Sequence, residues 1–257
     1  MHSRFQHPDR PWPVPSRPWA MRMDWHELLF MHWAVPAGAL RAHVPEALEV
    51  QTFHGKAWLG VVPFRMTNVR PRFVPPVPGL SAFPELNVRT YVTPAGIKGG
   101  PEDRPGVWFF SLDATNPVAV RVARCSYYLP YFDARISCAA NGGENTPTVK
   151  YSSRRTHKGA PPAELDLEYR PTGKVFHAGP GTLEYFLTER YCLYSANPGG
   201  VPYRCEVAHP PWPLRPAEAK VRRNTMTRQL GFDLPDEEPL LHYADYQPVV
   251  AWKPVRV

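Results

Sequence analysis

The sequence predicts a single globular domain of the α+β class that is mainly β, with only a few short helices. The chain has 257 residues, of which 43% are hydrophobic, enough to bury a large core. It contains 33 prolines in 257 residues, roughly 13% of the chain against a usual ~5%. Each proline removes a backbone donor and interrupts helices, so short strands and loops are favoured. No segment approaches the ~18 consecutive apolar residues of a membrane-spanning helix.

The first residues, 1–18, are expected to form an extended arm, and the domain itself to cover residues 19–257. Prolines recur at positions 8, 11, 13, 15 and 18, and repeated proline favours an extended chain of the polyproline type. An arm of this kind is available to dock on a neighbouring molecule. The segment has scattered Arg, His and Pro in place of an apolar signal core, which indicates a cytoplasmic protein.

Extended apolar segments bounded by Pro, Gly and Asn predict strands through most of the domain. Residues 49–66 are expected to form a hairpin that turns at Phe53-His54-Gly55. The next strands are expected at 85–92 and 107–113, after a proline-rich loop and across a glycine-rich link. Later strands are expected at 135–139, 148–156, 165–169, 191–195, 203–209, 240–246 and 249–252.

Three helices are expected between these strands. The clearest runs from Pro117 to Arg124, because Asn116 is a favourable N-cap and proline is favourable in the first turn. Residues 182–190 and 217–230 also show apolar side chains at helical spacing. No internal repeat and no linker between domains is found.

The charge and the cysteines argue against nucleic-acid and metal sites. The formal net charge is +7, which would favour phosphate binding. The basic residues are nevertheless spread along the chain, and the denser groups at 154–158 and 220–228 lack aromatic side chains for base stacking. The four cysteines lie far apart without a Cys-x-x-Cys pair, which favours reduced thiols with no metal; they are Cys125, Cys138, Cys192 and Cys205.

Two segments match part of a known cofactor-binding motif but lack a residue that the motif requires. The segment from His26 to Phe30 starts like the zinc-protease motif, but Phe30 occupies the position of the second histidine ligand. Gly179-Pro-Gly181 lacks the third glycine of a dinucleotide-binding loop. We therefore expect no cofactor.

The predicted strand 85–92 carries the most informative pattern. In a strand, alternate side chains share a face, so one face is polar, formed by Glu85, Asn87, Arg89 and Tyr91. The other face is largely apolar, formed by Leu86, Val88, Thr90 and Val92. Two interpretations stay open at this point: a sheet with its polar face in solvent, or a barrel whose interior binds a ligand. The following strand, apolar on both faces, ends in Asp113.

Several separated segments resemble, in the same order, the YqjF-like family of bacterial proteins known as domain of unknown function DUF2071. They include 30–33, 53–58, 182–191 and 209–212, and the resemblance covers residues 19–252. This family resembles the acetoacetate decarboxylase-like superfamily. The resemblance implies a cone-shaped antiparallel β-barrel with a central cavity and a few short peripheral helices.

The resemblance also bears on the chemistry. In the decarboxylase, a segment of the form G-R-E-x-x-G-x-P-K carries a lysine that forms a Schiff base. In the similar segment here, Arg124 and Pro130 match the arginine and proline of that motif, whereas Tyr131 stands where the lysine should be. Tyrosine cannot form an imine. If the protein is an enzyme, it is not expected to be a Schiff-base decarboxylase.

The resulting hypothesis is a barrel that binds a small organic acid or carbonyl compound and uses acid–base chemistry without a lysine. Glu85 would be the titratable acid or base and Tyr131 a hydrogen-bond donor to the ligand. Ligand contacts would come from Asn87, Arg89, Arg124 and Asp113. Two alternatives stay open: a non-catalytic binding or sensing module, and a structural protein that forms homo-oligomers. No nucleic acid and no membrane is expected as a partner.

Overall fold

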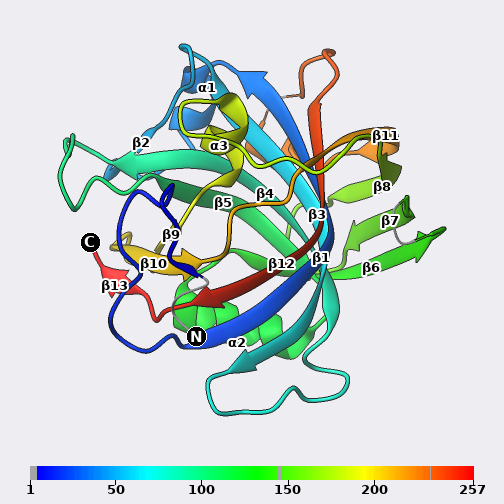
Figure 1. Ribbon diagram of the computed structural model, residues 1–257, viewed down its shortest axis with the longest axis horizontal. Helices are drawn as coiled ribbons and strands as arrows, with labels where there is room; N and C mark the ends of the chain where they lie inside the picture. The colour runs from blue at the N-terminus through cyan, green and yellow to red at the C-terminus, as the bar shows by residue number, and fades with distance from the viewer. Residues whose placement is uncertain (1–4, 144–145, 232) are drawn as a thin grey trace.

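The fold is a mainly β barrel with short helices at its periphery (Figure 1). The computed structural model describes residues 5–143, 146–231 and 233–257. In these residues the strands are β1 (Met21–Val35), β2 (Leu48–Val50), β3 (Ala57–Pro71), β4 (Phe83–Pro94), β5 (Gly106–Ala114), β6 (Tyr131–Asn141), β7 (Thr148–Arg155), β8 (Glu164–Pro171), β9 (Cys192–Ala196), β10 (Pro202–Ala208), β11 (Arg215–Asn224), β12 (Leu240–Ala251) and β13 (Val255–Arg256). The helices are α1 (Ala37–Arg41), α2 (Pro117–Tyr127) and α3 (Leu183–Thr188), with a 3-10 turn at Arg228–Leu230. None of the described helices is long and apolar enough to cross a membrane.

The strands close into two circuits that share one wall. Among the described strands, nine form the first circuit, in the order β4, β5, β6, β7, β8, β11, β12, β1 and β3. β9 and β10 close the second circuit, because β9 pairs with β5 and β10 pairs with β12. Figure 1 shows β6, β7, β8 and β11 on one side of the shared strands and β9 and β10 on the other. Most pairs are antiparallel, but β5 runs parallel to both β6 and β9.

The centre of the shared wall, at β4, is buried on both faces. Every residue of β4 from position 85 to position 92 is buried. Leu86 and Val88 belong to an apolar core inside the nine-strand circuit, together with Leu29, Met31, Leu59, Val61, Leu165 and Leu167. Glu85, Asn87 and Arg89 of β4 face the second circuit. The interpretation of β4 as a strand with a solvent-facing polar side is therefore excluded.

The structure differs from the sequence-based expectation at several elements. Residues 49–66 do not form the expected hairpin, because β2 pairs with β4 and only an isolated bridge joins Phe53 to Lys56. Residues 217–230, expected to be a helix, are mostly strand β11, which pairs with β8 and packs Ala217 and Ala219 against the core. Pairing with β8 on one side and β12 on the other decided this segment, since its apolar spacing fits both periods. The long strand β1 was not expected, because the alternation of apolar and polar residues over 21–26 ends at a register shift, and residues 28–33 are buried on both faces. Residues 240–246 and 249–252, expected as two strands, form the single strand β12 apart from Trp252.

The expected cap of the second helix is present. The side chain of Asn116 accepts hydrogen bonds from the backbone N–H groups of Val118 and Ala119, at 3.0 and 3.1 Å. Its own amide group donates to the carbonyl oxygen of Leu80 at 2.7 Å. The cap therefore joins the start of α2 to the loop between β3 and β4.

The described part of the N-terminal arm packs on its own barrel. The Arg10 guanidinium lies 4.3 Å from the centre of the Tyr191 ring and donates to the carbonyl oxygen of Val207. The indole N–H of Trp12 donates to the Glu206 carboxylate at 2.8 Å. A buried Phe5 packs near Trp252. The arm thus covers β9, β10 and β12 of its own chain. The sequence alone had left open whether it docks on a neighbouring molecule.

A buried ion pair reinforces the first circuit at one of its short ladders. β5 pairs with β6 over only residues 112–114. Just there, the Arg155 guanidinium donates to the Asp113 carboxylate at 2.7 to 3.1 Å, with the side chains 1% and 0% exposed. The third nitrogen of the guanidinium, Nη1, donates to Oε1 of Gln229 at 2.8 Å. Strand β7 is thereby tied to β5 across β6.

Replacing Arg155 with Met is expected to lower the free energy of unfolding by about 3–5 kcal/mol, because Asp113 is left buried without its partner. Denaturant unfolding followed by tryptophan fluorescence measures this. The matched control is Arg154→Met, because Arg154 is 77% exposed and its pair with Glu164 lies at the surface. That control should change the same quantity by less than about 1 kcal/mol. Equal losses in the two variants would contradict the assigned role of the pair.

Candidate functional site

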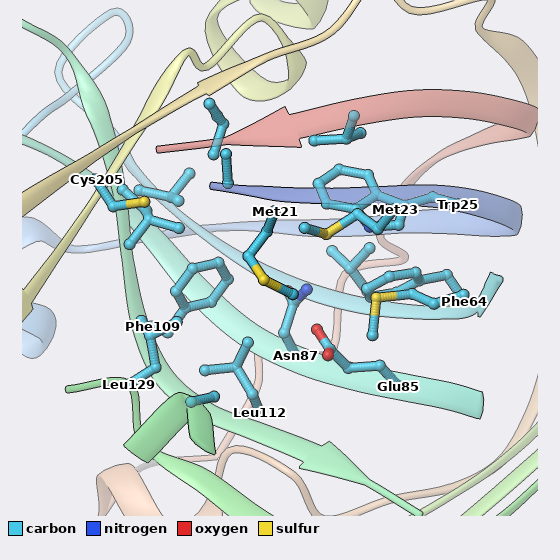
Figure 2. A pocket seen from close by; sticks show the side chains of 18 of the residues that line it. Met21, Met23, Trp25, Phe64, Glu85, Asn87, Phe109, Leu112, Leu129 and Cys205 are labelled. Carbon is cyan, nitrogen blue, oxygen red and sulfur yellow. The ribbon is translucent and has the colours of Figure 1, made fainter. Parts of the chain in front are cut away.

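The second circuit encloses a cavity of about 200 Å³. Its wall is formed by the shared strands with β9 and β10, and residues of α2 close one end. Most of the lining is apolar, and Figure 2 shows Met21, Met23, Trp25, Phe64, Phe109 and Leu112 around it. An apolar cavity of ~150 Å³ holds a benzene molecule. This cavity therefore has room for a ligand somewhat larger than benzene.

Cross-strand pairing explains which side chains reach the cavity. On β4, the residues Glu85, Asn87 and Arg89 line it. Their partners on β3 are, in the same order, Phe64, Val62 and Gly60. Residues paired directly across two strands lie on the same face of the sheet. On β5, Leu112 pairs with Asn87 and also lines the cavity. The polar row is therefore set in an otherwise apolar wall.

Glu85 and Tyr131 form the central polar contact of the cavity. The Tyr131 hydroxyl donates to Oε2 of Glu85 at 2.7 Å. Tyr131 is the first residue of β6 and pairs with Leu112, so its side chain faces the cavity too. The Tyr151 hydroxyl, from the other interior, donates to the backbone oxygen of Glu85 at 2.7 Å. Both the side chain and the backbone of Glu85 are therefore held in place.

Burial keeps the Glu85 carboxyl protonated at neutral pH. Loss of hydration raises its pKa to about 8, against the lowering effect of the Tyr131 hydrogen bond, and the nearby Asp113 charge raises the pKa further. Burial also holds the pKa of Tyr131 well above its ordinary value. Because Tyr131 donates to Oε2, the proton of Glu85 is available on Oε1. Glu85 is therefore a hydrogen-bond donor at the cavity wall.

Asn87 presents an acceptor to the same space. Among the described residues, its side-chain Oδ1 is buried and has no hydrogen-bond partner. Figure 2 shows the Glu85 carboxyl and the Asn87 amide pointing into the cavity beside Met21. An unsatisfied buried acceptor costs about 1–3 kcal/mol. A ligand with an O–H or N–H group can satisfy it.

Two of the predicted ligand contacts lie elsewhere. Asp113 pairs with Leu86 on β4, so it faces the nine-strand interior, where Arg155 neutralises it. Arg124 sits on α2 with its guanidinium donating to the backbone oxygen of Tyr131 at 2.6 Å. Neither Asp113 nor Arg124 lines the cavity. The residues of α2 that do include Ala123 and Tyr127. Alternation in β5 and the turn of the helix direct the two charged groups away from the cavity.

The sequence analysis missed several cavity residues in irregular segments. Thr188 is the last residue of α3, and Arg190 follows it. His209 and Trp212 follow β10. Burial lowers the pKa of His209 to about 4, so its imidazole is neutral. No periodic pattern marks such residues, because they lie between elements. The available signal was that 182–191 and 209–212 belong to the segments that carry the family resemblance.

Nothing in the described residues groups three or more His, Cys, Asp or Glu side chains as a metal would require. The four cysteines are all free. Burial raises the pKa of Cys205, at the cavity wall, to about 12. It is therefore a thiol at neutral pH.

Solved structures with the same architecture define the class of fold. The enduracididine biosynthesis enzyme MppR, solved with pyruvate, has a TM-score of 0.61 and 12% identity, with 97% of this chain and 94% of that chain covered. The acetoacetate decarboxylase of Legionella pneumophila subsp. pneumophila str. Philadelphia 1 has a TM-score of 0.59 and 11% identity, with 100% and 94% covered. At these identities the likeness establishes the fold alone, which is acetoacetate decarboxylase-like.

The chain belongs to the DUF2071 family of uncharacterized conserved proteins, whose sequence model matches residues 22–248. It is 44% identical over 239 residues to the uncharacterized protein YqjF of Bacillus subtilis strain 168, covering 93% of each chain. The resemblance found in the sequence is thereby confirmed.

The titration of Glu85 should be visible in the folded protein. Infrared difference spectra should show a protonated carboxyl band that disappears with a midpoint near pH 8 in the native protein and is absent in Glu85→Gln. In Tyr131→Phe the midpoint should move higher, because the hydrogen bond that stabilises the carboxylate is lost. A midpoint near the ordinary value of 4.5 in the native protein would contradict this protonation state.

The same shift gives a pH-dependent stability. The folded pKa of Glu85 lies above its unfolded value, so its contribution is complete below pH 4.5 and is lost as the pH rises through 8. The total loss is on the order of 5 kcal/mol. We expect the native protein to lose stability over this range relative to Glu85→Gln, as measured by urea unfolding at several pH values. A difference between the two proteins that does not change with pH would refute the shift.

Proposed function

We propose that the cavity binds a small organic acid or carbonyl compound and that Glu85 is its acid–base group. The observation that carries this proposal is the protonated Glu85, held by Tyr131 at the wall of an apolar cavity beside the unpartnered Oδ1 of Asn87. A purely structural barrel would leave no such space and would satisfy its buried acceptors. The structure of MppR with pyruvate shows that a protein of this fold accommodates a small oxo acid.

The geometry supports proton transfer to a carbonyl group. A carbonyl oxygen next to Oε1 of Glu85 would accept its proton as a hydrogen bond, and this would polarise the C=O bond. When the proton moves to the ligand, the Tyr131 hydroxyl would stabilise the carboxylate left behind, because it already donates to Oε2. Tyr131 is thus proposed to act on Glu85 and not directly on the ligand.

The proposed chemistry does not use an imine. Tyr131 occupies the position expected for the decarboxylase lysine, and no lysine is among the residues that line the cavity. Arg89 remains a proposed ligand contact, since it lines the cavity. Arg124 and Asp113 are left out of the proposed site, because their charged groups have other partners.

Binding is tested with a panel of small ligands on the purified protein. Isothermal titration with pyruvate, levulinate and pentanone should detect at least one of them, and Glu85→Met, which has no hydrogen-bond donor, should weaken that ligand about tenfold, equivalent to one lost hydrogen bond of ~1.4 kcal/mol. Glu218→Met is the control, because this residue lies exposed on β11 and pairs with Arg170 outside the cavity. Unchanged binding in a folded Glu85→Met protein would remove Glu85 from the site. An empty protein that binds none of the three would favour the structural alternative.

A trapping experiment tests the absence of an imine. Incubation with acetoacetate and borohydride should leave the intact mass unchanged, because a Schiff base needs a primary amine at the site. Mass spectrometry measures this directly. A stoichiometric adduct on any lysine would overturn the proposal.

A further inference from the structure

Two arginines face the cavity without an acidic partner. Arg89 and Arg190 both line it and are only 8% and 7% exposed. In the part of the chain that the structure describes, neither has a carboxylate within ion-pair distance. By contrast, the buried Arg10 and Arg155 each pair with a buried acid. A buried charge without a counter-charge costs several kcal/mol. The two positive charges of the cavity are therefore available to an anion.

Arg89 is held in position but keeps a free donor. Its guanidinium lies 5.2 Å from the centre of the Phe30 ring and 5.7 Å from that of Tyr91. Its Nη2 makes only two long hydrogen bonds, each of 3.4 Å, to the Tyr91 hydroxyl and to the backbone oxygen of Leu187. Its Nε is buried and has no partner among the described residues. Aromatic faces thus orient the group and leave its donors to a ligand.

A missing side chain makes room for this arrangement. His32 on β1, Gly60 on β3 and Arg89 on β4 lie side by side across the sheet. A Cβ atom on Gly60 would lie 3.2 Å from the His32 ring and 3.4 Å from Cγ of Arg89. Across this gap, the Tyr91 hydroxyl contacts both Nε2 of His32, at 2.6 Å, and Arg89. Burial, helped by the Arg89 charge, keeps the pKa of His32 well below its ordinary value, so His32 is neutral.

Arg190 also packs against the ring of Tyr91. Its guanidinium is 4.9 Å from the centre of the Tyr91 ring and 4.4 Å from that of Phe186. Its Nε donates to the backbone oxygen of Phe186 and its Nη1 to Gln51, both at 2.6 Å. Burial lowers the pKa of Arg190 to about 10, which still leaves it charged at neutral pH. Both arginines therefore lie near Tyr91, and both partners of Arg190 are neutral.

We propose that Arg89 and Arg190 form a carboxylate-binding subsite at one end of the cavity, with Arg89 as the direct contact. This inference rests on the proposed function and names its ligand class: an oxo monocarboxylate, with the carboxylate at the arginines and the carbonyl at Glu85. Glu85 and Arg89 are four residues apart on β4, or about 13 Å between Cα atoms. The two ends of the ligand are therefore separated by several bonds. The size of the cavity limits the remainder of the ligand to a short apolar chain.

The test compares levulinate with levulinamide, which has the same shape and no charge. At fixed ionic strength, isothermal titration of the native protein should show levulinate binding at least about tenfold tighter. Arg89→Met should abolish this preference while levulinamide still binds, and Arg89→Lys should restore part of it. Gly60→Ala should reduce it, because the added methyl crowds the His32 ring, whose Nε2 contacts the same Tyr91 hydroxyl that bonds Arg89. Arg121→Met, which removes an exposed arginine paired with Asp133, is the control and should keep the full preference.

The outcomes separate this inference from the proposed function. Equal binding of acid and amide by the native protein would overturn the carboxylate subsite and leave the proposed function standing. An acid preference that survives in a folded Arg89→Met protein would also overturn it. If the native protein binds neither compound, the proposed ligand class fails and the subsite with it. The comparison on the native protein decides the question even if Arg89→Met does not fold.

Discussion

The structure depends on one constraint: the strands β12, β1, β3, β4 and β5 belong to two closed circuits at once. A strand in an ordinary barrel has one face in solvent, whereas β4, at the centre of this shared wall, has an interior on either side. The apolar side of β4 completes the core of the nine-strand circuit. Its polar side then has no route to bulk water. Glu85, Asn87 and Arg89 must find their partners inside, and this requirement sets the chemistry of the cavity.

The cavity meets this requirement differently at each end. At Glu85, the cost of a buried charge is avoided by protonation, and Tyr131 occupies one oxygen. At Arg89 that route is closed, because a guanidinium does not lose its proton in proteins. Aromatic rings and weak hydrogen bonds replace a carboxylate there. The result is a proton donor at one end and unneutralised positive charge at the other, with apolar walls between them.

Local pattern was sufficient for elements whose neighbours reinforce it. The alternation in 85–92, the Asn116 cap and most later strands could all be read from short segments. It failed where pairing overrode propensity, as in 217–230, which became strand β11 beside β8. It also failed at Asp113 and Arg124. Both are polar residues next to cavity residues, but the alternation of a strand and the turn of a helix point them the other way.

By itself the sequence determined the mainly β class, the family, and the sharing of one face by Glu85, Asn87 and Arg89, because these follow from composition, motif order and the two-residue period of a strand. Only the tertiary structure decided which interior that face meets. It also decided that Tyr131 reaches Glu85 and that Arg190 joins Arg89. The physical reason is that partners far apart in the chain determine burial, and burial determines protonation and the need for a counter-charge. No local pattern in one segment contains that information.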